Sequence, residues 1–314
     1  MSAIVILGVF VADTAYRADR APRIGETILG NSFALGPGGK GSNQAVAAAR
    51  VGGDTTFLGK LGCDPFADMA LATWAAAGVK PRVTQSTESY TGAAYIFIEE
   101  ATGNNAIIIC PGIAATLSPG DIEAERELIA GAKVFVTQLE QPMPAALRAL
   151  QIARAAGVTT ILNPAPAAPL SDEMLALCDY VTPNETEVEA LTGVHVESLA
   201  DAARAAEALL ARGVGTAIIT LGERGAYFHS PHHRQLIPIF KAGPVVETTG
   251  AGDAFNGGFA AALARGDTPV QAVIFASAVA GLSVTRAGTA ASMPFRAEVD
   301  ALLANAAHRD QNAG

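Results

Sequence analysis

Short, continuously apolar segments alternate with Ala-rich stretches along most of this chain, and this alternation limits the possible folds more than any other feature. The apolar segments are rich in Val, Ile, Thr and Phe, as is typical of strands buried on both faces of a parallel sheet. They span residues 4–9, 55–59, 133–138, 158–163, 179–182 and 216–221. In the intervening stretch 144–156, polar residues recur every three positions opposite a leucine-rich face, which predicts an amphipathic helix. The repetition of strand, helix and strand predicts a doubly wound α/β sheet.

Two segments, 13–35 and 90–110, interrupt the alternation because they carry strand-like residues without a helical pattern. The second holds two β-rich runs around a Thr-Gly-Asn-Asn turn, which predicts a hairpin. We expect both segments to form a small β-sheet lid on a main domain of residues 1–12, 36–89 and 111–314. Apolar residues exposed on one face of this lid, such as Ile96, Ile98 and Ile108, would be covered by a second copy, so we expect a homodimer through the lid.

Composition excludes several classes of partner and location. The formal net charge is −9 and no long basic run is present, which argues against nucleic acid or an anionic membrane surface as the partner. The apolar run 4–12 follows no basic segment, and the stretch 272–284 is too short to span a bilayer. Three widely spaced cysteines suit neither a disulfide framework nor a zinc site. We therefore expect a reduced, soluble, cytoplasmic protein. The five histidines are expected at the surface or in loops, without a functional role: His195, His229, His232, His233 and His308.

The first of two glycine loops, residues 36–41, matches the dinucleotide pattern G-x-G-x-x-G. A dinucleotide fingerprint joins the first strand to the first helix, and its acidic residue ends the second strand. Here the first predicted strand is 4–9, and the acidic residue Asp54 precedes the next strand. This context disfavours a dinucleotide site. A Walker A loop is also absent, because no Gly-Lys-Ser/Thr follows four residues after a glycine.

The second glycine loop, Glu-Thr-Thr-Gly-Ala-Gly-Asp at 247–253, runs into an Ala-rich helical stretch at 259–264. Gly250, Ala251 and Gly252 would present backbone N–H groups at a helix N-terminus, which is a favourable site for an anion. Asp253 could cap this helix, a contribution of about 0.3–1 kcal/mol. It could also act as a general base beside a bound phosphate. Because a cap does not need three small neighbours, the loop composition favours the base.

The chain resembles the PfkB carbohydrate kinases in an ordered set of motifs that covers about residues 4–305. Three of them are Gly-Gly-Lys-Gly-Ser-Asn-Gln at 38–44, Asn-Glu-Thr-Glu at 184–187 and Thr-Gly-Ala-Gly-Asp-Ala-Phe-Asn-Gly at 249–257. Others, at 138–140, 162–166, 182–185, 220–225 and 284–288, are similar to those of the ribose kinases of this family. The resemblance implies a ribokinase-like three-layer α/β/α domain with a small β-sheet lid.

The resemblance further implies an ATP-dependent kinase that phosphorylates the 5-hydroxyl of D-ribose to give ribose 5-phosphate. Asp253 would be the general base, and the amides of Gly250, Ala251 and Gly252 would form the anion hole, since phosphoryl transfer depends on positioning and charge stabilisation. The implied sugar contacts are Val11, Asp13, Gly39, Lys40, Gly41, Ser42, Asn43, Glu140 and Asp253. The implied nucleotide contacts are Asn184, Glu187, Thr220, Leu221, Gly222, Glu223, Arg224, Gly225, Gly252 and Ser277.

The resemblance also implies two metal ions. Glu187, with Asn184, would organise Mg²⁺ through water. The alternative is a first-turn acid that complements the helix dipole, and the flanking Thr-Pro-Asn at 182–184 favours the Mg²⁺ role. A K⁺ ion beside the anion loop would be held largely by backbone carbonyls. The matching positions are Glu247, Thr249, Ser283, Arg286, Gly288 and Ser292.

Two positions depart from the ribose-kinase pattern. Val11 stands where Asn is usual, and the residues at 112–114 read Gly-Ile-Ala instead of Gly-Ala-Asn. The loss of a polar contact at Val11 leaves open another pentose, such as 2-deoxyribose. Nucleoside and fructose kinases of the same fold also remain open, as does a sugar-binding regulator without catalysis. Such a regulator would be free to lose Asp253, Asn184 and Glu187, so their presence favours catalysis.

Overall fold

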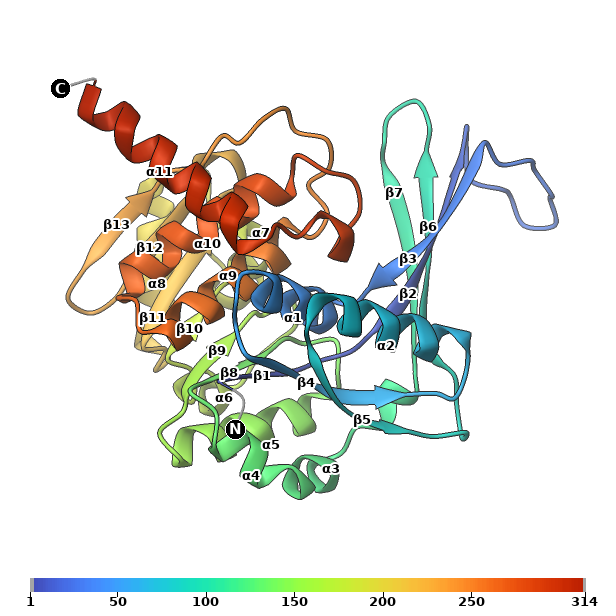
Figure 1. Cartoon of the computed structure of the whole chain (residues 1–314), viewed down its shortest axis with the longest axis horizontal. Coiled ribbons are helices and arrows are strands. Elements are labelled where there is room, and N and C mark those ends of the chain that lie inside the picture. Colours follow the sequence, from blue (N-terminus) through green and yellow to red (C-terminus); the bar gives the residue numbers. More distant parts are fainter. Residues whose placement is uncertain (1–2, 313–314) are drawn as a thin grey trace.

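The computed structural model describes residues 3–312, and the side chains as far as residue 306. Its strands form two separate sheets (Figure 1). The larger sheet contains β1 (Ile4–Leu7), β4 (Thr55–Leu61), β5 (Lys80–Gln85), β8 (Val134–Thr137), β9 (Thr159–Leu162), β10 (Tyr180–Val181), β11 (Thr216–Thr220), β12 (Ala226–His229) and β13 (Arg234–Ile237), in the order β13-β12-β11-β10-β9-β8-β1-β4-β5. The six strands predicted from the sequence are all present and all parallel, so the predicted α/β class is confirmed.

Three strands of the large sheet were not predicted. β5 lies at one edge and is mostly exposed, so its sequence lacks the apolar run that marks the central strands. β12 and β13 form an antiparallel hairpin at the opposite edge. Mixed edges of this kind are common on otherwise parallel sheets.

The central strand β1 shows why the apolar runs are continuous. Ile4 and Ile6 belong to one hydrophobic core and Val5 and Leu7 to the other, because successive side chains point to opposite faces of the sheet. One face is covered by α1 (Lys40–Arg50), α2 (Pro65–Ala77), α9 (Ala251–Arg265), α10 (Pro269–Ser283) and α11 (Arg296–Asn312). The other is covered by α3 (Pro119–Ala124), α4 (Arg126–Ala130), α5 (Met143–Ala155), α6 (Asp172–Ala176), α7 (Glu185–Thr192) and α8 (Leu199–Ala211). Three short 3₁₀ turns complete the chain: η1 (Ile113–Thr116), η2 (Gly222–Arg224) and η3 (Ala290–Ser292).

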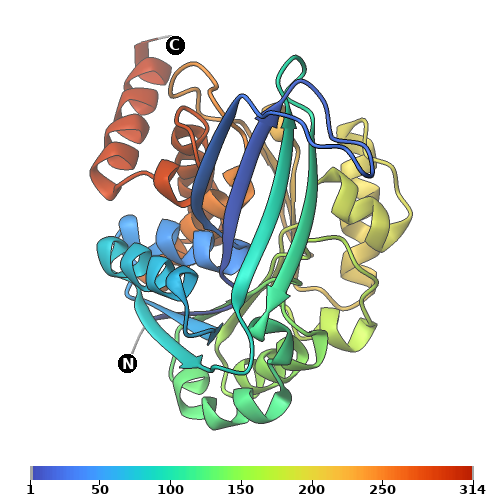
Figure 2. The ribbon, with the colours of Figure 1, turned by 90° about the vertical axis from the view of Figure 1, so that its right-hand side faces the viewer.

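The smaller sheet stands off the main body, as Figures 1 and 2 show from two sides. It contains β2 (Val11–Ala18), β3 (Ser32–Gly38), β6 (Thr91–Glu99) and β7 (Asn105–Gly112), in the order β3-β2-β6-β7. β6 and β7 are the predicted hairpin, and they pair antiparallel. The strands lie within or close to the segments 13–35 and 90–110, while the lid function of this sheet stays a prediction.

The register of the small sheet corrects one expectation about its faces. Ile96 pairs with Ile107, whereas Ile108 pairs with Tyr95, so Ile108 lies on the opposite face from Ile96 and Ile98. Ile96 and Ile98 are half-buried, and only Ile108 of the three is exposed. A one-residue difference in register exchanges the faces of a strand, and the sequence of the hairpin does not specify it.

The histidine expectation is also corrected at one position. His229 is buried at the end of β12, and burial lowers the pKa of its imidazole. His195, His232 and His233 are exposed as expected, and the side chain of His308 lies outside the described residues. Within residues 3–312, no helix is long and apolar enough to cross a membrane.

Candidate active site

The first turns of α1 and α9 lie against each other, and this packing joins the two glycine loops. Gly257 permits the close approach, because a Cβ at this position would lie 2.5 Å from the carbonyl oxygen of Gln44 and 2.6 Å from the Cβ of Ala47. The segment 40–44 of α1 therefore faces Asp253 in the first turn of α9. Asn43 and Asp253, which are both among the implied sugar contacts, therefore meet at one place.

The Asp253 carboxylate is buried and accepts two hydrogen bonds from α1. Asn43 Nδ2 donates to Oδ2 over 3.0 Å, and Gln44 Nε2 donates to Oδ1 over 3.1 Å. Burial raises the pKa of Asp253, while the Lys40 ammonium and these two hydrogen bonds oppose the rise. A carboxylate with a raised pKa is suited to general-base chemistry, because its proton affinity comes closer to that of the group it deprotonates.

Helix α9 begins without a side-chain cap. Its N-cap, Gly250, has a φ of +82°, in the left-handed region that favours glycine. The Ala251 N–H donates to the Thr248 carbonyl over 3.1 Å, while within the described residues the Gly250 and Gly252 amides donate to no backbone carbonyl. The Asp253 side chain is directed to α1, so helix capping, one of the two roles considered for it, is not observed. The uncapped first turn can still receive an anion.

Asp253 is surrounded by further ionisable side chains. Burial and the Asp253 charge raise the pKa of Asp13 to about 6, and burial raises that of Glu140 to about 7. The backbone N–H of Lys40 donates to Glu140 Oε2 over 2.7 Å. Burial lowers the pKa of the Lys40 ammonium, but the charges of Asp253, Glu140 and Glu187 outweigh this effect and hold it above its usual range. The site therefore gathers carboxylates around one cation.

The raised pKa of Glu140 predicts a pH-dependent loss of stability that a neutral side chain should remove. Its pKa is about 7 in the folded protein and close to 4.5 in the unfolded chain, so stability falls as the pH rises through this window. We expect Glu140→Gln to raise the free energy of unfolding by about 2 kcal/mol at pH 8 and by much less at pH 5. Urea unfolding at both pH values measures this, and an equal difference at pH 5 and pH 8 would contradict it.

Asn184 and Glu187 lie at the start of α7, next to the end of β11. Asn184 Oδ1 accepts from the Glu187 N–H over 2.8 Å, and Glu187 Oε2 accepts from the Asn184 N–H over 2.9 Å, which is a capping box. The Thr220 N–H donates to the Pro183 carbonyl over 2.9 Å, and Asn184 forms a β-bridge with Thr220. The predicted pair and the predicted nucleotide loop 220–225 are thus adjacent. The structural role of Glu187 is observed, and its link to Mg²⁺ stays a prediction.

The residues predicted to hold K⁺ come from two segments that lie side by side. The N–H groups of Val246 and Glu247 donate to the Val284 carbonyl over 2.8 and 3.2 Å, and Glu247 Oε2 accepts from the Gly288 N–H over 2.8 Å. Thr249 belongs to the first segment, and Ser283, Arg286 and Ser292 belong to the second. Within the described part of the chain, no group of three or more His, Cys, Asp or Glu side chains is arranged to hold a metal ion. A cation here would depend on backbone carbonyls, which suit K⁺.

The remaining predicted residues occupy two different environments. Val11 is buried in a small apolar cluster with Val9, Ala94 and Ala114, on the same strand as Asp13. Ser277 is buried in α10, which packs on α9. The structure therefore places Val11 and Asp13 in the first residues of β2 and Ser277 within α10, which packs on α9.

Sequence reasoning missed a buried amide network beneath Asp253. Gln44, Gln138 and Asn163 are joined by hydrogen bonds, and Asn163 lies just beyond the end of β9. These residues could have been found from the sequence, because polar residues that directly follow apolar strands lie at the carboxyl ends of those strands. Ligands of α/β sheets usually bind at that edge.

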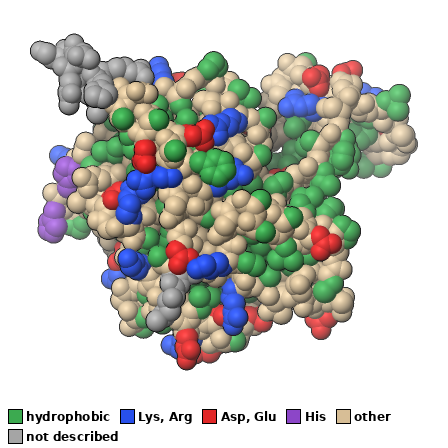
Figure 3. Space-filling view, viewed as in Figure 1, with side chains coloured by type: hydrophobic (Ala, Val, Ile, Leu, Met, Phe, Trp, Pro, Cys, Tyr) green, Lys and Arg blue, Asp and Glu red, His purple; other side chains and the backbone are tan. Residues whose placement is uncertain are grey.

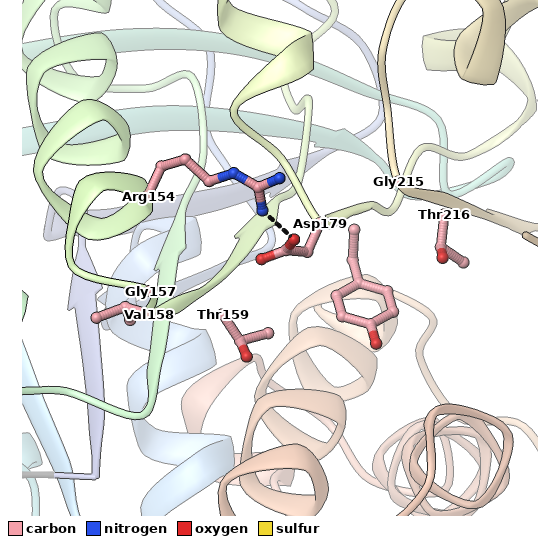
Figure 4. Close-up of a pocket in the computed structure, with 8 residues that line it drawn as sticks. Arg154, Gly157, Val158, Thr159, Asp179, Gly215 and Thr216 are labelled. Atoms are coloured by element: carbon pink, nitrogen blue, oxygen red, sulfur yellow. Dashed lines mark hydrogen bonds and ion pairs between the residues drawn. The ribbon is translucent and has the colours of Figure 1, made fainter.

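A surface pocket lies at the opposite edge of the sheet (Figure 4). It is lined by the residues that precede or begin β9, β10 and β11, and it contains the ion pair of Arg154 with Asp179. None of the predicted site residues lines it. The candidate active site is instead at the carboxyl edge, where Asn163 and Thr220 lie.

The family model for pfkB family carbohydrate kinases matches residues 1–296. This chain belongs to the pfkB family of carbohydrate kinases. A ribokinase of Staphylococcus aureus (strain COL) is 38% identical over 95% of this chain and 98% of its own length. The chain is thus a carbohydrate kinase of the ribokinase type, and the family predicted from its motifs is confirmed.

Three further proteins are similar to this chain; one has a different activity, one is longer, and one is a solved structure. A deoxyribokinase of Salmonella typhi is 35% identical over 93% of this chain and 95% of its own length. A bifunctional ribokinase/ribose-5-phosphate isomerase A of Fructilactobacillus sanfranciscensis is 39% identical over 99% of this chain, which spans only 57% of that protein. The solved structure of an Arabidopsis thaliana ribokinase complexed with ribose and ATP has 31% identity and a TM-score of 0.91, covering 96% of this chain and 98% of its own. The predicted ribokinase-like fold is therefore confirmed.

Proposed function

We propose that this pfkB kinase transfers the γ-phosphoryl group of ATP to the 5-hydroxyl of D-ribose. The observation that carries the proposal is the buried Asp253 carboxylate, which belongs to the uncapped first turn of α9 and accepts a hydrogen bond from Asn43. A plant relative solved with ribose and ATP supports the choice of both substrates.

Asp253 acts as the general base in this proposal. It takes the proton of the sugar 5-hydroxyl as that oxygen bonds to the γ-phosphorus and the bond to the ADP oxygen breaks. The Gly250, Ala251 and Gly252 amides, at the positive end of the α9 dipole, stabilise the charge on the transferring group. Lys40 adds a positive charge within the same site.

The sugar is held by groups that surround Asp253. Asn43 Oδ1 is buried and has no hydrogen-bond partner among the described residues, so a sugar hydroxyl could donate to it. Asp13 and Glu140 offer further acceptors. Residues 40–42 were predicted as part of a loop, but they form the first turn of α1 after its N-cap Gly39; in this proposal, this glycine-containing start of the helix lets the backbone approach the sugar closely.

The nucleotide and the cations occupy the neighbouring loops. Residues 220–225 and Ser277 contact the nucleotide, and Glu187 with Asn184 orders Mg²⁺ through water. Mg²⁺ supplies charge neutralisation on the phosphates when it is bound. K⁺ is held beside α9 by the segments that contain Glu247 and Gly288. We place this activity in the cytoplasm, because the free, exposed thiols of Cys63 and Cys110 suit a reducing compartment.

A panel assay tests the proposed function. Purified protein with ATP and Mg²⁺ is assayed against ribose, 2-deoxyribose, fructose and adenosine, with and without K⁺. The highest kcat/KM is expected for a pentose. A clear preference for adenosine or fructose would contradict the proposal, and absence of phosphorylation of every sugar would favour a binding protein.

A second candidate substrate, 2-deoxyribose, is favoured by the environment of Val11. This side chain is 3% exposed and lies among Val9, Ala94 and Ala114. The cluster therefore has no polar side chain that could bind a sugar hydroxyl. A hydroxyl that faces this cluster loses a hydrogen bond worth about 0.5–1.5 kcal/mol. A sugar without that hydroxyl loses nothing, and one relative is a deoxyribokinase.

Val11→Asn should restore the polar contact and raise the preference for ribose. Because 1.4 kcal/mol corresponds to a factor of ten, the ratio of kcat/KM for ribose to that for 2-deoxyribose should rise by up to about tenfold. The ratio is measured for both sugars in the native protein and the variant. An unchanged ratio would show that Val11 does not face the sugar.

We also propose that two copies of the chain associate through the small sheet. The face that carries Tyr16, Phe33, Tyr95 and Ile108 is exposed, and the Tyr16 ring lies 5.1 Å from Phe33 and 5.4 Å from Tyr95. Hydrophobic side chains gather on this projecting sheet in Figure 3. An apolar face of this kind favours burial against a partner.

Tyr95→Glu is expected to convert the dimer to a monomer at micromolar concentration, because a charge would be buried at the centre of the apolar face. Sedimentation velocity measures the change. Leu199→Glu, which alters an exposed leucine on α8, is the control and should leave the dimer intact. A native protein that is monomeric at micromolar concentration would exclude this association.

A further inference from the structure

A continuous buried hydrogen-bond network connects Asp253 to the ends of three strands of the large sheet. Gln44 Nε2 donates to Asp253 Oδ1 over 3.1 Å and to Asn163 Oδ1 over 3.1 Å. Gln138 Nε2 donates to Gln44 Oε1 over 2.7 Å. Gln44 and Gln138 have no exposed surface, and Asn163 is 6% exposed.

The network returns to the anion loop by a second route. Asn163 Nδ2 donates to the Thr182 carbonyl over 3.1 Å, and Thr182 Oγ1 donates to Asn256 Oδ1 over 2.6 Å. Asn256 Nδ2 then donates to the Gly252 carbonyl over 2.8 Å. The Asp253 side chain and the Gly252 carbonyl are therefore both hydrogen-bonded to one network, which is anchored at the ends of β8, β9 and β10.

The orientation of the Gln44 amide is determined by its neighbours. Both of its N–H groups are used, one by Asp253 and one by Asn163, and its oxygen accepts from Gln138. A flipped amide would place its oxygen against the Asp253 carboxylate and its N–H groups against a donor. In a buried site both arrangements are costly, so the donor stays directed at the carboxylate.

We propose that Gln44 is a positioning residue that holds Asp253 in its reactive orientation and keeps it ionised. The proposal rests on the proposed function, in which Asp253 is the base. Asn43 also contacts Asp253, but its oxygen remains available for the sugar. Gln44 is instead saturated by protein groups, so its contribution to the reaction passes through Asp253.

Other charged groups face Asp253 and must be separated from the effect of Gln44. Lys40 on α1 favours the ionised carboxylate, while Asp13 on β2, Glu140 after β8 and Glu187 on α7 disfavour negative charge nearby. No hydrogen bond joins Gln44 to any of these four among the described residues. A change at Gln44 should therefore alter the pKa of Asp253 more than theirs.

The test is the pH dependence of kcat at saturating ribose and ATP. Gln44→Met keeps the side-chain length and removes the donor, so the pKa of Asp253 rises. The acid limb of the profile, where kcat falls because Asp253 becomes protonated, should therefore move to higher pH by about one to two units. We expect kcat at pH 7 to fall about tenfold or more, with KM for ribose nearly unchanged.

Gln141→Met is the matched control. Gln141 is also a buried glutamine of this network, since it donates to Thr137 Oγ1 and to the Gln138 carbonyl, but it does not contact Asp253. Its variant should lose stability without moving the acid limb. If Gln44→Met and Gln141→Met have the same pH profile, Gln44 is only a structural residue and the inference is wrong.

Gln44→Glu covers the case in which Gln44→Met does not fold, because it preserves shape and volume. Two carboxylates in contact share one proton and titrate in two steps as a pair, so the pH profile should gain a second ionisation at higher pH. A pH profile unchanged from that of the native protein overturns the inference. If the native protein phosphorylates no sugar, the proposed function fails first, and that result is distinct from active native protein with an unmoved limb.

Discussion

Asp253→Asn is expected to lower kcat by roughly 10²–10⁴-fold, the largest effect of any single substitution considered. The amide keeps the shape of the side chain but cannot accept the proton of the sugar hydroxyl. Binding of ribose and ATP should change little, so the loss should appear in kcat. Initial rates at saturating substrates, with separate measurement of ribose binding, distinguish the two.

The same variant should remain folded. Asp253 accepts from Asn43 and Gln44, and an Asn there would offer one acceptor and one amino group. Asn43 can rotate its amide, so that Oδ1 accepts from the new amino group and Nδ2 can donate to the sugar hydroxyl in its place. The buried negative charge is removed at the same time, so we expect an unchanged or slightly higher melting temperature.

A control substitution distinguishes the loss of the base from the general effect of removing a carboxylate from the first turn of a helix. Asp68 is an exposed aspartate in the first turn of α2, and Asp68→Asn should leave kcat unaltered. If Asp253→Asn retained near-full turnover with its best sugar, the assignment of the base would be wrong. If both variants lost activity equally, the loss would come from the fold.

Gly39→Ala is expected to have the second-largest effect, on both stability and catalysis. Gly39 is the N-cap of α1 with a φ of +88°, and a Cβ there would lie 2.5 Å from the Val9 carbonyl oxygen and 3.0 Å from the Phe10 Cα. These are backbone atoms of the connection between β1 and β2, so the start of α1 must shift. Lys40 and Asn43 would shift with it.

Gly52→Ala isolates the strain of the backbone from the clash. Gly52 lies at the other end of α1 with a φ of +94°, and a Cβ there meets nothing within 4 Å. We expect this control to cost about 1–2 kcal/mol and to leave kcat/KM intact. Gly39→Ala should cost at least about 2 kcal/mol more and lower kcat/KM by about 10²-fold, since a displacement near 1 Å at a site has that effect.

Urea unfolding and steady-state kinetics on both variants test this prediction. Equal loss of stability would show that the Val9 contact is relieved without cost. Retained kcat/KM in a folded Gly39→Ala protein would show that the start of α1 does not set the geometry of the sugar site.

Most of the central sheet could be predicted because strands buried on both faces have a continuous apolar sequence. β1 sends Ile4 and Ile6 into one core and Val5 and Leu7 into the other, so a strand covered on both faces must be apolar throughout. β5 has no continuous apolar sequence, because its position at the edge of the sheet exposes most of its residues. β12 and β13 were missed because the predicted pattern assumed strands separated by helices.

The candidate site was predicted from short motifs, each of which needs particular residue types at fixed spacing. Gly250 must reach a φ of +82°, so glycine at this position is a local requirement that the sequence displays. The requirement at Gly257 comes instead from the approach of α1. The network beneath Asp253 was not predicted. Gln44 and Asn163 lie in two of the family motifs, but nothing in those motifs shows that the two side chains meet.

By itself, the sequence determined the α/β class and the family and predicted Asp253 as the base, because periodicity, backbone freedom and motif spacing are properties of neighbouring residues. Only the tertiary structure decided what those residues meet. It placed Ile108 opposite Tyr95 instead of on the face of Ile96, since register depends on pairing between strands. It also brought Gln44 to Asp253, 209 positions further along the chain. That contact follows from the order of strands and the packing of α1 on α9, and no local pattern specifies it.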